Sequence, residues 1–373
     1  MELETLKTPC LVLDLERVRR NAARMSERVR SFGAALRPHV KTHKCPEVAR
    51  IQTRGHSGAI TVSTLHEARA FAYYGFTDIL YAVPIEPGKF DEAIELARVC
   101  ERLALITDDA EIPVLINERA RRKGVILDLF LKIDCGYHRC GVEPESAEAL
   151  EIARRIQDSS HLSFGGILTH AGHSYHCRDV EEIRAIARHE RDTMTAAASR
   201  FRSQGIDVPA ISIGSTPTIT HVDHLEGVDE ARPGNYIFFD AFQATLGSCR
   251  LDDCALTVLA AVVHRDRTRR KVVLDAGAIA LSKDRGAVEL DPSCGYGLVL
   301  DLEGLDTGAR IGGLSQEHGE LVIDDEECFD RLKVGARVRV LANHSCLTAA
   351  QHSHYNVLDG GRVVDRWEIQ RGW

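Results

Sequence analysis

The chain has 373 residues, 44% of them hydrophobic and 27% charged, which is the balance of an ordinary globular protein. Its net charge of −8 argues against a nucleic-acid partner, and no apolar stretch approaches the ~20 residues that span a membrane. The acidic start (1–6) does not resemble a secretory signal, and the eleven cysteines show no disulfide spacing, so we expect a cytoplasmic protein with reduced thiols.

Short apolar, β-rich runs alternate with amphipathic segments through the first two thirds of the chain. The eight runs lie at 35–41, 59–64, 78–83, 103–107, 126–134, 164–170, 210–214 and 235–239. The helix-like segments between most of them are 16–31, 65–74, 89–100, 110–122, 146–157 and 179–204. Eight β-then-α units within about 240 residues predict an α/β fold of the TIM (β/α)8 barrel type over residues 12–245.

The pattern changes after about residue 246. Strand-like runs joined by turns follow, without a long helix, at 256–263, 271–274, 320–323, 337–342 and 362–370. Asp359-Gly360-Gly361 is a strong hairpin signal. We therefore expect a second, all-β domain over 246–373, to which residues 1–11, continuing into the run 8–14, add a strand.

Lys41 lies in Arg37-Pro38-His39-Val40-Lys41-Thr42-His43-Lys44, at the end of the first predicted strand. Burial of an ammonium group is costly, so a lysine at the end of a buried strand tends to lose its proton or to form a covalent bond. A neutral amine is a nucleophile that forms a Schiff base with a carbonyl cofactor such as pyridoxal phosphate. The alternative is a solvated surface lysine that follows a strand.

Reactive groups of barrel enzymes lie at the carboxyl ends of the strands, and phosphate is commonly bound after strands seven and eight. Arg139 follows the fifth predicted strand, 170–175 follows the sixth, and 232–236 lies at the eighth. Gly214-Ser215-Thr216 follows the seventh and precedes a short helix expected around Ile219. Its backbone N–H groups and hydroxyls suit a phosphate, although a plain helix cap is the alternative.

His344-Ser345-Cys346 is a candidate metal site. On a strand, residues i and i+2 point to the same side, so the imidazole and the thiolate can reach one ion. This pair suits Zn²⁺, and two protein ligands leave positions open for water and substrate, as in catalytic sites. The alternative is a buried cysteine beside a hydrogen-bonded histidine.

Together these motifs resemble those of the fold-type III pyridoxal-phosphate enzymes, which pair an alanine-racemase-like barrel with a β-domain. Within this class the chain is most similar to the D-threonine aldolase and D-serine dehydratase family, over essentially its whole length. The resemblance rests on Thr8-Pro9, the Lys41 segment and Gly172-His173-Ser174-Tyr175, and on Gly214-Ser215-Thr216-Pro217-Thr218, Arg232-Pro233-Gly234-Asn235-Tyr236 and Asn343-His344-Ser345-Cys346.

The resemblance implies a role for each matching residue. Lys41, rather than Lys44, would form the Schiff base and take the α-proton of the substrate. Tyr175 would face the pyridine nitrogen, and Arg139 would lie near the phenolic oxygen of the cofactor or the substrate carboxylate. Arg232 would be structural. The residues that would hold the phosphate are Gly214, Ser215, Thr216, Gly234, Asn235 and Tyr236.

The implied activity is that of a pyridoxal-phosphate- and divalent-metal-dependent lyase, in which His344 and Cys346 bind Zn²⁺, or alternatively Mn²⁺ or Mg²⁺. Aldolase members often have an aspartate at the position of Cys346, which favours a dehydratase. Its substrate would be a small β-hydroxy-D-amino acid, either D-serine or D-3-hydroxyaspartate, and its products a 2-keto acid and ammonia.

Other activities stay open at this point. In a D-threonine or 3-hydroxy-D-aspartate aldolase, His173 would take the β-hydroxyl proton. A racemase, a non-enzymatic pyridoxal-phosphate carrier and a zinc hydrolase without that cofactor are further alternatives. The fold type also implies a homodimer.

Overall fold

The computed structural model describes residues 2–373 and contains two compact units. The first, which we call the barrel unit, comprises Arg24–Lys41, Ala49–Gly234 and Arg371–Trp373. The second, the β-unit, comprises the chain up to Ala23, Thr42–Val48 and Asn235–Gln370. The domain limits that the sequence predicts, at residues 12 and 245, stay a prediction.

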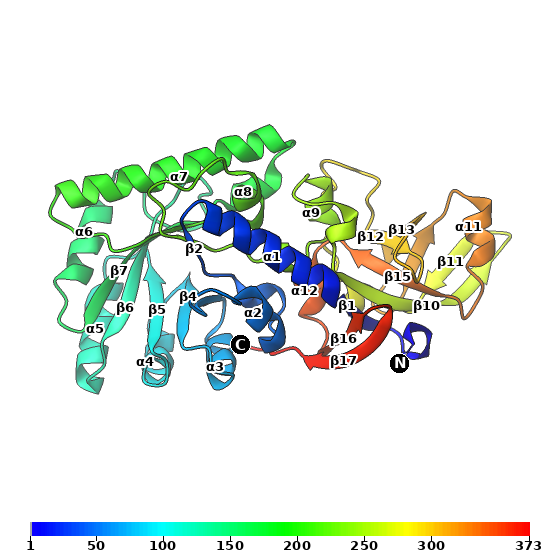
Figure 1. The fold of residues 1–373 in the computed structure, drawn as a ribbon, viewed down its shortest axis with the longest axis horizontal. Helices are drawn as coiled ribbons and strands as arrows, with labels where there is room; N and C mark the ends of the chain where they lie inside the picture. Colours follow the sequence, from blue (N-terminus) through cyan, green and yellow to red (C-terminus); the bar gives the residue numbers. More distant parts are fainter. Residues whose placement is uncertain (1) are drawn as a thin grey trace. The chain divides into compact units, whose positions relative to one another are not determined.

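The barrel unit is built on eight parallel strands in the order β2-β9-β8-β7-β6-β5-β4-β3. Figure 1 labels β2 and β4 to β7 of this sheet. A parallel bridge between His39, beyond β2, and Thr61 of β3 joins the two ends of this order. The strands are β2 (Ala35–Leu36), β3 (Ile60–Val62), β4 (Asp78–Pro84), β5 (Arg102–Thr107), β6 (Leu127–Lys132), β7 (Leu162–Leu168), β8 (Ile211–Ile213) and β9 (Glu230–Ala231). This arrangement confirms the predicted TIM-type barrel.

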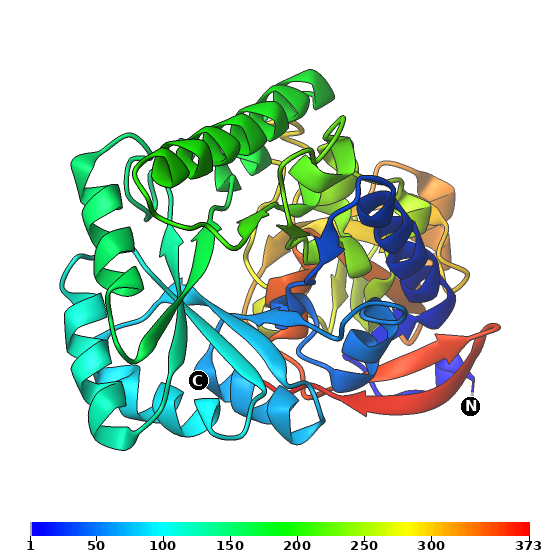
Figure 2. The same ribbon diagram turned by 60° about the vertical axis from the view of Figure 1, so that its left-hand side comes forward.

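Helices lie outside the strands of the barrel unit, as the cyan-to-green ribbons of Figure 2 show. They are α2 (Pro46–Gln52), α3 (Leu65–Tyr73), α4 (Phe90–Ala97), α5 (Ile112–Lys123), α6 (Ala147–Gln157), α7 (Val180–Ser203) and α8 (Thr216–His221), and α1 (Leu15–Ser31) passes from one unit to the other. Side chains of Thr64, Ser146 and Asp179 cap α3, α6 and α7 by accepting backbone N–H groups. Their apolar faces pack on strands that are buried almost throughout.

Two of the predicted barrel strands differ from the structure. The eighth strand is Glu230–Ala231, whereas the predicted run 235–239 begins as the 3₁₀ turn η5 (Asn235–Ile237). Pro233 intervenes and has no N–H group for a ladder hydrogen bond, so the strand ends before it. The first predicted strand, 35–41, is also shorter, because the chain turns into the 3₁₀ turn η2 (Val40–Thr42) after the His39 bridge.

The β-unit contains a nine-stranded sheet in the order β11-β14-β13-β12-β15-β10-β1-β16-β17, with β11 also paired to β10. Its strands are β1 (Cys10–Asp14), β10 (Leu256–Asp266), β11 (Lys271–Leu274), β12 (Gly297–Leu300), β13 (Asp306–Leu314), β14 (Gly319–Val322), β15 (Arg337–Ala342), β16 (His354–Asp359) and β17 (Arg362–Glu368). Strand β1 runs antiparallel to β10 and parallel to β16. The N-terminal segment is thus part of this sheet.

The predicted hairpin at Asp359-Gly360-Gly361 is confirmed, since it joins the antiparallel strands β16 and β17. Gly360 and Gly361 have φ values of 57° and 76°, which a tight primed turn requires. The helices of this unit are short: α9 (Ala241–Thr245), α10 (Ala278–Leu281), α11 (Glu326–Arg331) and α12 (Ser345–Ala349). Among the described residues, no helix has the length and apolarity to cross a membrane.

Candidate functional site

Lys41 lies in the 3₁₀ turn η2, directly after the segment that bridges to β3. Its backbone N–H donates to Nδ1 of His39 over 3.4 Å. The side chain is exposed, so the expectation of a lysine buried by the end of a strand is wrong. The reason is that the strand ends five residues earlier, at Leu36, and Lys41 lies in the 3₁₀ turn that follows the His39 bridge. Lys41 is accessible to a ligand at this end of the barrel unit.

The loop after β6 carries Arg139 and is organised by one buried carboxylate. Oδ1 of Asp134 accepts the backbone N–H groups of Gly136, Tyr137 and His138 over 2.9–3.1 Å. The guanidinium carbon of Arg139 lies 5.0 Å from the centre of the Tyr137 ring. A cation–π contact of this kind holds the exposed arginine over the loop while its N–H groups can still bind an anion.

The segment after β7 forms the 3₁₀ helix η4 (Gly172–His176), which contains His173 and the half-buried Tyr175. The His173 ring stacks on Tyr137, with centroids 6.2 Å apart and planes inclined by 27°. Gly172 is required here, because a Cβ atom would come within 2.2 Å of the Tyr137 ring. Burial, followed by the charge of His189, lowers the pKa of His173, and its buried Nδ1 makes no hydrogen bond among the described residues.

The candidate phosphate loop follows β8, and the short helix expected around Ile219 is confirmed as α8. Ser215 caps this helix in a capping box with Thr218, and the two hydroxyls lie 3.0 Å apart. Gly214 has φ = +112°, and a Cβ atom there would lie 2.7 Å from Cγ1 of Ile219. Gly214, Ser215 and Thr216 are all buried, so the loop is built from small residues at the end of the strand.

Glu190 of α7 connects the loops that follow β7 and β8. Its Oε1 accepts the backbone N–H groups of Ala171, over 3.0 Å, and of Gly214, over 3.1 Å. Burial raises the pKa of this carboxyl group. The side chain is 1% exposed and sets the relative position of two loops that carry candidate site residues. It was not predicted, because a single glutamate on a long helix has no motif around it.

His170, which follows β7, lies in a region of positive electrostatic potential in the barrel unit. Burial first, and then the charges of Lys41, Lys132, Arg139 and Arg232, hold its pKa well below the usual 6.5. Its Nδ1 lies 3.5 Å from the carbonyl oxygen of Gly214 in the candidate phosphate loop. The imidazole is therefore neutral and sits among four cations that come from different parts of the barrel sequence.

Arg232 lies in a buried hydrogen-bond network of the barrel unit, which is consistent with the structural role expected for it. Its guanidinium donates to the Thr169 carbonyl oxygen and the Ser212 hydroxyl, and Glu230 lies close enough to favour its charge. Glu230 also accepts from Arg37 over 2.8 Å and from Ser212 over 2.6 Å. This buried network joins β2, β8 and β9.

The remaining candidate phosphate residues fall in both units. Gly234 ends the barrel unit, and Asn235 and Tyr236 begin the β-unit, where both are buried. The Asn235 amide donates to Oγ of Ser345 over 3.1 Å and to Sγ of Cys346 over 3.7 Å. The structure thus brings Asn235 next to the candidate metal centre.

His344 and Cys346 do not lie on a strand, so the strand-based expectation is wrong. Strand β15 ends at Ala342, and His344 is the N-cap residue of the short helix α12. The two side chains nevertheless interact with each other. Among the described residues, no third His, Cys, Asp or Glu joins this pair at metal-binding distance. The pair therefore has the composition of an open metal site.

Three contacts hold the metal motif in place inside the β-unit. Asp284 accepts from Nδ1 of His344 over 2.8 Å, which leaves Nε2 of His344 for a metal ion. Asp240 accepts the backbone N–H group of Ser345 over 2.9 Å. Sγ of Cys346 lies 3.3 Å from the Thr42 hydroxyl. Asp284 is the partner that sequence reasoning missed, because it lies 60 residues from His344 and belongs to no motif.

The protonation states of the pair favour metal binding by the sulfur. Burial alone raises the pKa of the Cys346 thiol, but the hydrogen bonds and charge of His344, together with Thr42, bring it below its usual 9.0. Against the opposite effect of burial, Asp284 and Cys346 raise the pKa of His344 to about 11. A metal ion binds the thiolate of Cys346 and the neutral imidazole of His344, so its binding would displace the proton from His344.

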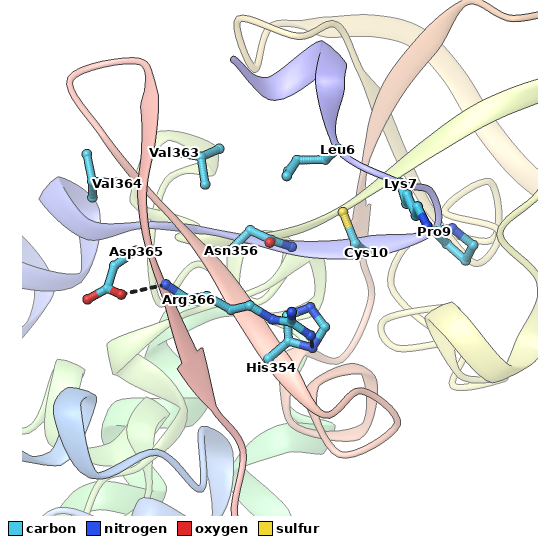
Figure 3. A pocket seen from close by; sticks show the side chains of 10 residues that line it. All are labelled: Leu6, Lys7, Pro9, Cys10, His354, Asn356, Val363, Val364, Asp365 and Arg366. Carbon is cyan, nitrogen blue, oxygen red and sulfur yellow. Dashed lines mark hydrogen bonds between the residues drawn. The ribbon is translucent and has the colours of Figure 1, made fainter. Parts of the chain in front are cut away.

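A separate groove of about 580 Å³ lies in the β-unit between the N-terminal segment and strands β16 and β17 (Figure 3). Cys10, Asn356 and Val363 line its wall. His354 also lines it and lies 2.9 Å from Nη2 of Arg366. The histidine-rich segment 351–355 therefore contributes to this groove.

Comparison with known proteins identifies the family. The model for the N-terminal domain of alanine racemase matches residues 13–241, and the model for the serine dehydratase domain matches residues 255–358. The D-threo-3-hydroxyaspartate dehydratase of Delftia sp. (strain HT23) is 40% identical over 100% of this chain and 99% of that protein. Its solved structure has a TM-score of 0.96 and covers 100% of both chains.

Two further relatives extend the comparison. The D-serine dehydratase of Dictyostelium discoideum is 34% identical over 100% of this chain and 98% of that protein. The solved D-threonine aldolase from Filomicrobium marinum is 28% identical, with a TM-score of 0.87 over 99% of this chain and 97% of that one. The chain thus belongs to the fold-type III family of lyases that joins an alanine racemase N-terminal domain to a serine dehydratase domain, as its motifs predicted.

Proposed function

We propose that this chain is a pyridoxal-phosphate- and metal-dependent dehydratase of β-hydroxy-D-amino acids, which converts D-3-hydroxyaspartate or D-serine into a 2-keto acid and ammonia. The pair of Cys346 and His344 carries the proposal, because a thiolate and an imidazole side by side would form a soft metal site on a chain whose barrel unit offers an accessible amine, Lys41. The Delftia and Dictyostelium relatives are both dehydratases, which supports it further.

The barrel unit fits pyridoxal phosphate by the chemistry of its groups. Lys41 would bind the aldehyde of the cofactor covalently. The small buried residues Gly214, Ser215 and Thr216 would hold the phosphate, and Gly234 and the N–H groups of η5 would extend this cradle. The cations near His170, which add to the effect of burial in lowering its pKa, would favour a doubly negative phosphate ester. When bound, this cofactor withdraws electrons from the α-carbon of an amino acid.

The protein groups then have distinct tasks. Arg139 would bind and orient the substrate carboxylate, and Tyr175 would face the cofactor ring. The Lys41 amine would take the α-proton, because an amine at the mouth of the barrel can act as a base. His344 and Cys346 would hold Zn²⁺, which acts as a Lewis acid toward the β-hydroxyl group. A cysteine mutant of the Delftia dehydratase has been solved in a metal-free form, which supports a metal in this family.

The second candidate function is an aldolase that cleaves the Cα–Cβ bond. One observation favours it: His173 is a neutral imidazole whose buried Nδ1 has no hydrogen-bond partner among the described residues. Such a group can accept the proton of a β-hydroxyl. The D-threonine aldolase of similar structure is consistent with this alternative.

Product analysis separates the two functions. The purified enzyme is mixed with D-serine, D-threonine and the D-3-hydroxyaspartate isomers, with and without added Zn²⁺ or Mn²⁺. Keto acid with ammonia supports the dehydratase, whereas an aldehyde with an amino acid identifies the aldolase. Lys41→Ala should abolish turnover, and also the yellow colour that a Schiff base between Lys41 and pyridoxal phosphate would give the protein. Lys44→Gln, three residues further on, serves as the control. Full activity of the Lys41→Ala variant would refute the scheme.

We also propose that the enzyme is a cytoplasmic homodimer, since its thiols are all free and the fold type is commonly dimeric. Analytical ultracentrifugation of the purified protein tests the dimer, and a single species of 41.3 kDa would contradict it. Cell fractionation tests the location.

A further inference from the structure

Lys132 is the last residue of β6, at the strand end where barrels place their reactive groups. Its side chain is only 5% exposed. Among residues 2–373, no hydrogen bond or ion pair reaches its Nζ atom. A buried ammonium without a partner is costly, so this arrangement indicates that an anion from outside the chain completes it.

The charged neighbours of Lys132 do not neutralise it. Burial, and then the positive charges of Arg232 and Arg139, lower its pKa to about 8, so it is still protonated at neutral pH. Cys140 and Cys135 act on Lys132 in the opposite direction, but burial raises the pKa of the Cys135 thiol to about 12, so that thiol is neutral. The surroundings of Lys132 thus add positive charge.

Two of the cations near His170 are committed to the fold or to the proposed chemistry. Arg232 donates to Thr169 and Ser212, and Lys41 would hold the cofactor. Arg139 differs from both, since among the described residues it has a cation–π contact with Tyr137 but no hydrogen bond or ion pair. Lys132 and Arg139 are therefore two uncommitted cations, seven residues apart, on one strand and the loop that follows it.

We propose that Lys132 and Arg139 form a subsite for two carboxylates, so that the enzyme selects β-hydroxy-D-amino acids that carry a second carboxylate on the β-carbon. This inference rests on the proposed function. Arg139 takes the α-carboxylate, which every substrate has, and Lys132 takes the β-carboxylate. A monocarboxylic substrate such as D-serine leaves Lys132 buried and unpaired in the complex, and that difference is the source of the selectivity.

Binding of unreactive analogues to the holoenzyme tests the subsite without turnover. D-aspartate has both carboxylates but no β-hydroxyl, and D-alanine has only one. Isothermal titration calorimetry should show that Lys132→Met raises the Kd of D-aspartate by about 10- to 100-fold, as expected for a lost charge-assisted hydrogen bond. The Kd of D-alanine should change less than ~3-fold, since Lys132 does not touch it.

Lys123→Met is the matched control. Lys123 belongs to the same unit, but its side chain is exposed and lies 3.7 Å from Glu95, so both Kd values should be unchanged. If Lys132→Met does not fold, Lys132→Gln replaces it with the same expectation. Equal losses for both analogues would overturn the proposal and assign Lys132 to the cofactor or the α-carboxylate. Unchanged binding of D-aspartate would overturn it too.

Failure of the inference and failure of the proposed function give different results. If the wild-type enzyme binds D-aspartate through Lys132 but produces no keto acid from any substrate, the subsite stands and the dehydratase does not. If it produces keto acid and Lys132→Met lowers kcat/KM equally for D-serine and D-threo-3-hydroxyaspartate, the dehydratase stands and the subsite is refuted.

Discussion

Replacing Lys132 with Met should make the substrate-free protein more stable at neutral pH. The pKa of Lys132 falls from 10.5 to about 8 on folding, because burial and the charge of Arg232 disfavour the ammonium. The unfolded chain therefore binds this proton more tightly than the folded one. By linkage, the protonated lysine costs the fold about 3 kcal/mol at pH 7 and about 1 kcal/mol at pH 9.5.

The sign of this effect is unusual for a lysine. A lysine that gains a carboxylate partner on folding stabilises the protein at low pH and loses that contribution as the pH rises. Lys132 has its pKa lowered instead, so the stability of the wild-type protein should rise with pH from about 8 toward 10.5. Methionine has a similar length and no charge, so the variant lacks this dependence.

Urea denaturation at pH 7 and pH 9.5, without substrate, measures the effect. At pH 7 the variant should have the higher free energy of unfolding, because only the wild type must bury a protonated lysine. This difference between variant and wild type should be about 2 kcal/mol smaller at pH 9.5, where the lysine is largely deprotonated in the folded protein. Lys123→Met, which removes an exposed lysine, should show a constant difference. A variant that is less stable than wild type by the same amount at both pH values would refute the reasoning, because it would mean that Lys132 is well paired in the fold.

Two further substitutions test the rest of the site. Asp284→Asn should weaken zinc binding by about 10- to 100-fold in competition with a chromophoric chelator, because it removes the charged partner of His344. The control Asp291→Asn, which removes a carboxylate that bonds Ser293, should leave the affinity unchanged. Equal affinities for all three proteins would contradict the assignment. Glu230→Gln should destabilise the fold by ~3 kcal/mol in urea at pH 7, because it leaves Arg37 poorly compensated. Burial would raise the pKa of Glu230, but Arg37 outweighs it and holds this pKa below the usual 4.5. The stabilisation by the ionised Glu230 is therefore complete above pH 4.5, and the stability difference between the variant and wild type should become smaller below it. A stability difference that does not change with pH would contradict the pairing.

The sequence predicted the parts of the fold that continuous apolar runs define. Strands β4, β5, β6 and β7 are buried runs of six or seven residues, and their positions agree with the predicted runs within two residues. Strand β9 has only two residues, one of them Glu230, so it has no apolar run to detect. Strand β13 was missed because its sequence, Asp306–Leu314, contains three glycines and is largely accessible.

The candidate site was predictable where a motif is continuous in sequence. His344 and Cys346 are two residues apart, and their interaction was expected although their helical setting was not. A strand and the first turn of a helix can both bring such residues together, so the pattern alone did not distinguish them. Asp284 and Glu190 act through contacts with residues far away in the sequence. Lys132 is notable because it lacks a hydrogen-bond partner among the described residues. Neither property produces a local sequence motif.

The basic residues of the barrel unit differ in role according to their partners, which their identity alone does not indicate. Arg37 is paired with Glu230 and Asp78, and Arg232 donates to backbone and hydroxyl oxygens, so both guanidinium groups have hydrogen-bond partners inside the fold. Lys132 and Arg139 have no such partner among the described residues. Buried carboxylates lie beside some cations of the barrel unit and not beside others, so the strand ends keep a net positive charge. On our proposal, the cations without a partner determine how many carboxylates the preferred substrate carries.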